Sequence, residues 1–371
     1  MLGHHGHGFG QRLVRGDGEE RVSLDTQDVA DFHGEVLGVV GFGTQETVLL
    51  RQYSPHPARV HPEETCVMPM RFMLAGRQLH ADQTPGAAPD SRCVVFVHGA
   101  LNDRSVWTHA ARWCRTQGLG VLVPDLPGHG LSEGPPDADI GAMADTLLAL
   151  LRSAGLRRTV LVGHSMGSLI ALEVAARLAG PDKAPQDPQI SDLVLVGTAF
   201  PMRVAPVLLQ QAAEAPLQAI ELIASLSHAG PSDGRAERQA ASRARMQRVL
   251  AGCDARLLPE GRRTLLELDL AACDRHDSAL AAARLLTEAG GPPRCHLICG
   301  ELDQMTPVRR TAALRDALQA EQQTLPQAGH AMMEDDPEGF VAALQAVLQA
   351  EATARPVRPS PADAPSSPDA G

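Results

Sequence analysis

Ser165 has the clearest setting for chemistry in this sequence. It lies within Gly-x-Ser-x-Gly, between Gly163 and Gly167, after the apolar run Val160-Leu161-Val162 and before helix-forming residues. A serine at a sharp strand-to-helix turn has a strained backbone and an exposed hydroxyl, which suits a nucleophile. The glycines allow close backbone approach where a Cβ would clash. The first amides of the following helix, Met166 among them, would stabilise negative charge forming beside the serine.

Composition excludes several classes of function. The chain has 371 residues and a formal net charge of -11, which argues against binding to nucleic acid. No apolar run reaches the roughly 18 residues of a membrane span. The residues after Met1 lack the apolar core of a signal peptide, and the seven cysteines have no regular spacing. We therefore expect a cytoplasmic protein with free thiols.

The absence of certain residues also narrows the chemistry. The only lysine is Lys183, in a proline-rich loop, so Schiff-base chemistry and a phosphate-binding Gly-Lys-Ser/Thr loop have no place. The sequence contains neither Cys-x-x-Cys nor His-Glu-x-x-His. Cys295 and Cys299 share one face of a predicted strand and are interpreted as buried core thiols. We predict no cofactor and no metal.

The order of apolar runs predicts a parallel sheet covered by helices on both faces. Short continuous apolar runs are typical of buried parallel strands, and they alternate here with amphipathic helical patterns. The predicted strands are Met70–Ala75 and Arg77–Ala81 as a hairpin, then Cys93–Val97, Val121–Asp125, Val160–Val162 and Asp192–Gly197; the predicted helices are Arg104–Gln117, Ile140–Leu151 and the segment from Ser165 to Ala179.

This alternation stops after Pro201. Helical patterns alone follow, over Val204–His228, Arg235–Leu250 and Glu260–Glu288, until the core resumes at Cys295. We predict that this block is an inserted cap over the carboxyl ends of the strands. The predicted organisation is a partly disordered extension over 1–64, a core over 65–200 and 293–350, a helical cap over 201–292, and a disordered tail over 351–371. Thr306 is expected to cap a helix that begins at Pro307.

Five motifs in register carry a resemblance to a known family. They are His98-Gly99, Asp125 to Gly134, Gly163 to Gly167, Gly300 to Pro307, and Gly329-His330. From about Met70 to Gln349 the sequence resembles the α/β-hydrolase superfamily in its lidded, esterase- or lipase-like form. The resemblance implies an α/β fold with a mostly parallel sheet, flanking helices and an inserted helical cap.

The resemblance also assigns roles. It implies a nucleophile at Ser165, an acid at Asp303 and a base at His330, in the chain order expected of this fold. Imidazole can take the serine proton and return it to the leaving group, while the carboxylate holds the tautomer. Glu301 and Asp335 are the alternative acids. Each of the three implied positions comes just after a predicted strand, the last of these being the short strand Gln323–Leu325 before His330. All three therefore lie at the edge of the sheet where sites in open α/β sheets are found.

An oxyanion hole requires two amide donors beside the serine. Met166 supplies one by its place after the nucleophile, and Ala100, directly after His98-Gly99, is preferred over Leu101 for the other. The remaining polar residues of these motifs are interpreted as structural; they are His98, His129, His164 and Asp125, the last organising its own glycine-rich turn.

The expected substrate is a small to medium acyl ester, cleaved through an acyl-enzyme. Dehalogenases and epoxide hydrolases of this fold use an aspartate where Ser165 stands, and the epoxide hydrolases also use tyrosines of the cap. The only tyrosine here, Tyr53, lies outside the cap, so neither activity is expected. Carbon–carbon bond hydrolysis, thioester hydrolysis, cofactor-free perhydrolysis and ligand binding without turnover remain alternatives. We expect a small-molecule acyl substrate and a monomer or homodimer. An apolar acyl pocket is predicted from Leu208, Leu209, Leu217, Ile220, Ile223, Met246 and Leu250.

Overall fold

A computed structural model describes most of the chain. It covers residues 67–86, 91–180, 183–229, 232–289 and 293–349, together with the backbone of 36–42 and 45–51. The predicted tail over 351–371 and the rest of the predicted extension lie outside these residues. Strands β1 (Val36–Phe42) and β2 (Gln45–Arg51) pair with each other in antiparallel fashion.

The strands in this part of the chain form one sheet, in the order β1-β2-β3-β4-β6-β5-β7-β8-β9-β10. The first four strands pair antiparallel, and β4 is antiparallel to β6. Every pairing from β6 to β10 is parallel, which confirms the predicted sheet. The strands are β3 (Met68–Leu74), β4 (Arg77–Thr84), β5 (Cys93–Val97), β6 (Gly120–Pro124), β7 (Arg158–His164), β8 (Gln189–Val196), β9 (Arg294–Gly300) and β10 (Glu321–Leu325).

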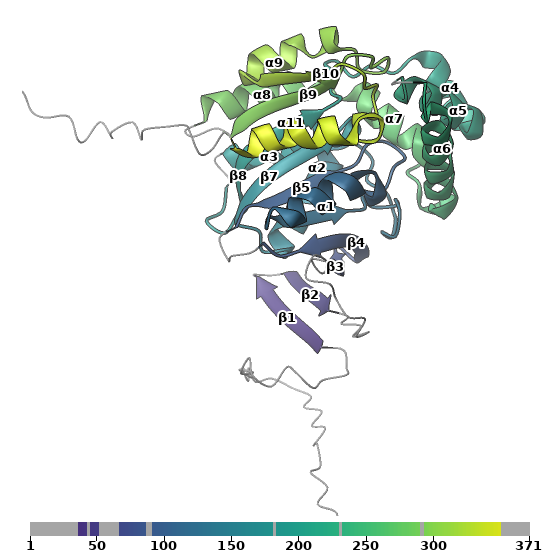
Figure 1. The fold of residues 1–371 in the computed structure, drawn as a ribbon. Coiled ribbons are helices and arrows are strands. Elements are labelled where there is room, and N and C mark those ends of the chain that lie inside the picture. The colour runs from purple at the N-terminus through teal and green to yellow at the C-terminus, as the bar shows by residue number, and fades with distance from the viewer. Residues whose placement is uncertain are drawn as a thin grey trace, which may run out of the picture.

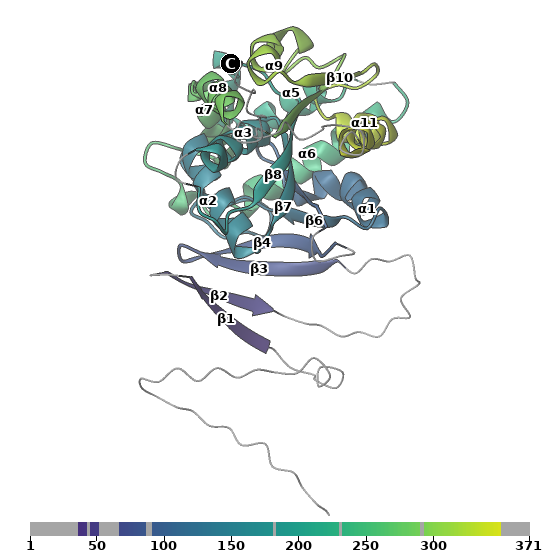
Figure 2. The same cartoon turned by 90° about the vertical axis from the view of Figure 1, so that its left-hand side faces the viewer.

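Helices cover both faces of the parallel strands (Figure 2). On one face lie α2 (Ile140–Ser153), α3 (Met166–Ala179) and α8 (Ala279–Glu288), and on the other lie α1 (Thr108–Thr116) and α11 (Pro337–Gln349). The central strands are apolar throughout because both of their faces are buried.

The second face is centred on one tryptophan. Trp107 is fully buried, with its ring 5.0 Å from that of Phe96 and 5.9 Å from that of Phe340, measured between centroids. It therefore joins a sheet strand to the closing helix.

Of the α-helices described between β8 and β9, the first four stand beyond the ends of the strands (Figure 1). They share an apolar cluster that is separate from the two core layers and that includes Leu101 of the core. These helices are α4 (Pro206–Glu214), α5 (Pro216–Ser227), α6 (Arg235–Gly252) and α7 (Leu265–Arg275).

Two predicted helical segments are each divided. The segment Val204–His228 breaks at Ala215, whose φ of -143° and ψ of 59° are not helical. The cause is Pro216, because a residue before proline avoids the helical region. The segment Glu260–Glu288 divides into α7 and α8, and the buried side of α8 belongs to the core layer with α3. We propose a cap over about 201–276, shorter than the 201–292 predicted.

Candidate active site

The strand-to-helix turn at Ser165 has the strained form expected from its sequence. Ser165 joins β7 to α3 with φ 52° and ψ -118°, in the left-handed region that residues with a side chain seldom adopt. A Cβ on Gly163 would clash with the carbonyl oxygen of Gly167, and one on Gly167 would clash with that of Val97. Both positions therefore require glycine, and the turn packs directly against the end of β5.

Asp303 follows β9 and contacts His330, which follows β10. Oδ2 of Asp303 accepts a hydrogen bond from Nδ1 of His330 at 2.9 Å, and both side chains are buried. Burial acts to raise the pKa of Asp303, but the adjacent His330 and the hydrogen bonds to the carboxylate outweigh it and hold this pKa well below its usual range. The carboxylate is therefore charged at neutral pH.

Thr306 has a role that the sequence did not indicate. Its hydroxyl donates to Oδ2 of Asp303 at 2.7 Å, and its amide and that of Met305 donate to Oδ1 at 2.8 Å each. The expectation that Thr306 caps a helix starting at Pro307 is wrong: a 3-10 turn (Val308–Arg310) with Pro307 at its N-cap comes first, then α9 (Ala312–Leu318). In sequence, a threonine that caps a helix cannot be distinguished from a threonine that hydrogen-bonds to a carboxylate such as that of Asp303.

His164, the last residue of β7, supports His330. Nε2 of His164 donates to the backbone carbonyl of His330 at 2.9 Å, and the two rings lie 4.7 Å apart between centroids. Burial and the nearby His330 lower the pKa of His164 to about 3, so it is a neutral donor. Gly197 faces the same ring, since a Cβ there would lie 3.2 Å from Nδ1 of His330.

The loop after β5 passes beside Ser165. A Cβ on Gly99 would lie 3.2 Å from the Cβ of Ser165, so the backbone at Gly99 and Ala100 borders the serine. The amide of Leu101 already donates to Oδ2 of Asp269 at 2.8 Å, which favours Ala100 over Leu101 as a donor to a ligand. Met166 is the first residue of α3, where amides have no partner within the helix.

His98 and Asp125 have structural contacts. His98 accepts from the amide of Leu126 through Nε2 at 3.0 Å and donates through Nδ1 to the carbonyl of Gly99 at 2.9 Å. Burial and the nearby His129 lower the pKa of His98 to about 3. Asp125 accepts from the amides of Arg104 and Leu131, bracing its own turn. These contacts match the interpretation from sequence.

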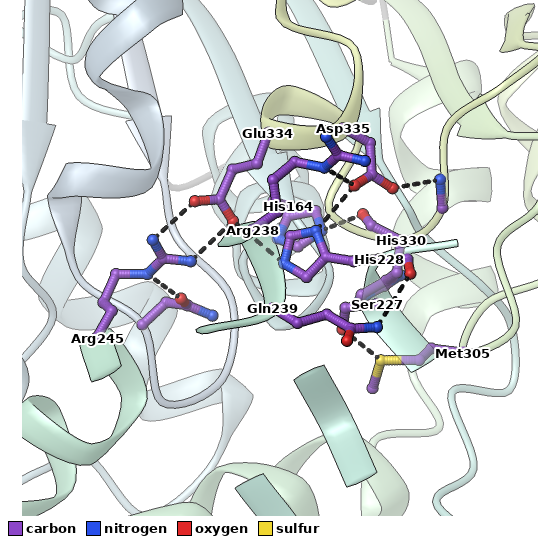
Figure 3. Close-up of polar contacts among 12 residues, drawn as sticks. His164, Ser227, His228, Arg238, Gln239, Arg245, Met305, His330, Glu334 and Asp335 are labelled. Atoms are coloured by element: carbon purple, nitrogen blue, oxygen red, sulfur yellow. Dashed lines mark hydrogen bonds and ion pairs between the residues drawn. The ribbon is translucent and has the colours of Figure 1, made fainter. Parts of the chain in front are cut away.

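Asp335, one of the alternative acids, has other partners. Its Oδ1 accepts from Nδ1 of His228 at 2.8 Å and from Arg238 at 3.1 Å, and its Oδ2 accepts from the amide of Gly329 at 2.8 Å (Figure 3). Glu301, the other alternative, is exposed. Asp303 is therefore the acid that meets the histidine. The cluster around His228 carried no motif in the sequence.

Ser165 and His330 line the same cavity, of about 510 Å³. Of the residues predicted to line an acyl pocket, Leu208, Ile223 and Met246 do so. Leu217 is exposed instead, and Leu209, Ile220 and Leu250 belong to the apolar cluster of the cap. This volume is typical of small-molecule sites. Further apolar lining comes from Val106, Met202, Val204, Leu226, Leu270 and Met333, among others.

The structure contains no arrangement of ligands for a metal within its described residues. No group of three or more His, Cys, Asp or Glu side chains in that part of the chain could hold an ion. Cys295 and Cys299 are buried thiols, and burial raises the pKa of each to about 12. In the same part of the chain, none of the helices combines the length and the apolar character that crossing a membrane would need.

The fold, the serine turn and the adjacent Asp303–His330 pair are typical of α/β-hydrolases. Comparison with known proteins leads to the same family. The profile of the alpha/beta hydrolase family matches residues 94–343. The chain belongs to this family, and a hydrolytic role is supported.

Curated relatives include lipases. The chain is 28% identical over 258 residues to the sn-1-specific diacylglycerol lipase ABHD11 of Mus musculus, covering 69% of this chain and 80% of the mouse protein. It is 30% identical over 145 residues to lipase LipV of Mycobacterium tuberculosis, covering 39% of this chain and 49% of LipV.

Solved structures show the same fold. The esterase EaEST from Exiguobacterium antarcticum has a TM-score of 0.60 at 16% identity, over 76% of this chain and 100% of the esterase. The enol-lactonase from Burkholderia xenovorans LB400 has a TM-score of 0.59 at 20% identity, over 75% of this chain and 99% of the lactonase.

Proposed function

We propose that the protein is a serine hydrolase that cleaves a small to medium acyl ester through an acyl-enzyme. The observation that carries this proposal is the buried Asp303–His330 pair, joined at 2.9 Å, beside a cavity that Ser165 also lines. The mostly apolar lining suits an acyl chain. The lipases among the relatives agree with ester chemistry.

In the proposed first half-reaction, Oγ of Ser165 attacks the ester carbonyl carbon as Nε2 of His330 takes the serine proton. Negative charge on the carbonyl oxygen is accepted by the amides of Ala100 and Met166. The C–O bond to the alcohol then breaks, and His330 gives its proton to the departing oxygen. The acyl group is now an ester of Ser165.

In the second half-reaction, water repeats the sequence. His330 takes a proton from the water as its oxygen attacks the acyl-enzyme, and the proton passes to Oγ of Ser165 as the acid leaves. Asp303 keeps the proton on Nδ1 of His330 throughout and stabilises the imidazolium. Among the hydrogen bonds of the described residues, none joins Ser165 to His330, so the proposal requires the serine hydroxyl to turn towards Nε2 when it reacts.

Labelling and turnover together test this proposal. A fluorophosphonate should label wild-type protein with one equivalent at Ser165, and p-nitrophenyl butyrate should be hydrolysed. Ser165→Ala should take no label and lose several decades of rate. Equal rates for the two proteins, or a folded wild type that takes no label, would favour a ligand-binding protein without turnover. A panel of esters and thioesters of graded chain length would then define the acyl group.

A further inference from the structure

The peptide that joins Ala100 to Leu101 is held at both of its polar atoms. The amide of Leu101 donates to Oδ2 of Asp269 at 2.8 Å, and the carbonyl of Ala100 accepts from Nδ2 of Asn102 at 3.0 Å. Leu101 has a φ of 48°. Such a conformation persists only when the surroundings enforce it, so these two contacts matter for the geometry next to the Ala100 amide.

The first of these contacts comes from the cap. Asp269 lies on α7 and is fully buried. The same Oδ2 atom also meets Nε2 of His129 at 2.9 Å, in the loop that follows β6. One cap carboxylate therefore connects two core loops, and its other oxygen has no hydrogen-bond partner among the described residues.

The second contact also depends on the cap. Arg245 lies on α6, and its Nε donates to Oδ1 of Asn102 at 2.9 Å. This bond orients the Asn102 amide so that its nitrogen faces the carbonyl of Ala100. The guanidinium is almost completely buried and lines the cavity that holds Ser165. Arg245 therefore acts on the loop at Ala100 through one intervening side chain.

Arg245 also contacts the helix that follows His330. Its two terminal nitrogens donate to both oxygens of Glu334 at 2.7 and 2.8 Å (Figure 3). Glu334 lies on α10 (Met332–Asp335), four residues after His330. A paired, two-point contact of this kind fixes direction as well as distance. One arginine of the cap thus ties the loop at Ala100 to the turn that carries His330.

The core alone holds the preceding peptide. The carbonyl of Gly99, which shares a peptide with the Ala100 amide, accepts from Nδ1 of His98 at 2.9 Å. The following peptide is held by Asp269 of the cap and by Asn102 of the core, which Arg245 of the cap contacts in turn. Because an amide donor stabilises an oxyanion only in a narrow range of directions, both sides of Ala100 must be fixed.

We propose that Asp269 and Arg245 are positioning residues that complete the oxyanion hole when the cap is docked on the core. This inference rests on the proposed function. It makes the cap a part of the catalytic machinery as well as a wall of the substrate pocket. Neither side chain is proposed to touch the reacting atoms.

The test compares Asp269→Ala and Arg245→Gln with Arg243→Gln. Alanine is used at 269 because the oxygen of an asparagine could take the place of Oδ2 and keep both of its hydrogen bonds. Arg243 lies on the same helix as Arg245 and makes an ion pair with Glu221, whose side chain is 60% exposed, so it controls for loss of charge from α6. Active sites are first counted by fluorophosphonate titration. For each protein, kcat and KM for p-nitrophenyl butyrate and the inhibition constant of an alkyl trifluoromethyl ketone, which forms a tetrahedral oxyanion with serine, are then measured.

Misplacing a donor should cost less than deleting it. We expect kcat per active site to fall about 10- to 100-fold in both variants, with KM within about 2-fold of wild type. Affinity for the ketone should fall by the same factor as kcat, and Arg243→Gln should match wild type. A residue that only stabilised the fold would lower the count of active sites and leave these three constants unchanged.

A further variant keeps the test decisive if Arg245→Gln folds poorly. In Arg245→Ala, added guanidinium ion should restore part of kcat, whereas the same concentration of sodium chloride should not. An active wild type with unchanged constants in Asp269→Ala and Arg245→Gln would overturn the positioning roles and leave the proposed function standing. An inactive wild type would overturn both.

Discussion

Replacing Asp303 by asparagine tests the proposed triad most directly, because it changes no volume. The carboxylate accepts four hydrogen bonds, from the amides of Met305 and Thr306, the hydroxyl of Thr306 and Nδ1 of His330. An asparagine can match only part of this set. The two backbone amides can only donate, so the side-chain oxygen of Asn must take the place of Oδ1.

The amide nitrogen of Asn would then face Thr306 and His330. The threonine hydroxyl can turn to accept a hydrogen bond, but Nδ1 of His330 can accept only if its proton moves to Nε2. That tautomer cannot take a proton from Ser165. We expect kcat to fall about 10⁴-fold, equivalent to about 5.4 kcal/mol of barrier.

The assay is hydrolysis of p-nitrophenyl butyrate at neutral pH, with circular dichroism to check the fold. Glu301→Gln is the matched control, since Glu301 is exposed and precedes Asp303 by two residues; it should retain wild-type activity. If Asp303→Asn kept more than about a tenth of wild-type kcat, the assignment of His330 and Asp303 as a working pair would be wrong.

Two further predictions concern stability. Gly163→Ala should lower the free energy of unfolding by at least about 3 kcal/mol, because its Cβ would meet the backbone of Gly167, which cannot move aside; Gly252→Ala, with nothing within 4 Å, should change it by less than about 1 kcal/mol. Similar denaturation midpoints for the two would contradict this. Asp335→Asn should cost about 3 kcal/mol at pH 7. Burial acts to raise the pKa of Asp335, but the hydrogen bond from His228 and its other donors lower it overall. The stabilisation of the fold by the Asp335 carboxylate is therefore fully present above its pKa in the unfolded chain, about 3.9. It is lost as the pH falls through the lower pKa that Asp335 has in the folded protein. The gap between mutant and wild type should narrow below about pH 4, and a gap constant to pH 3 would refute the assignment.

The parts of the fold that follow from local sterics could be predicted. The turn at Ser165 requires glycine at 163 and 167 because neighbouring backbone occupies the space of a side chain, and this requirement is visible in the sequence. Continuous apolar runs identified the central strands because those strands are buried on both faces. The hairpin over 70–81 was also predicted, and its strands form as β3 and β4.

The limits of the cap were harder to predict. Helical periodicity continues across Ala215, although Pro216 ends the helix there. It also does not show that α8 packs on the core rather than on the cap. Amphipathic helices in the two places carry the same pattern, since each has one apolar face whatever surface it meets.

The sequence by itself determined the class of protein and the chain order of serine, acid and histidine, because a strained turn and buried strands depend on residues adjacent in the chain. Only the tertiary structure decided which polar groups support them. Thr306, Asp269 and Arg245 have ordinary local settings, and their importance comes from partners as far away as 168 residues, between Leu101 and Asp269. Burial then makes each of these contacts matter, since a polar group removed from water must find its partner within the fold.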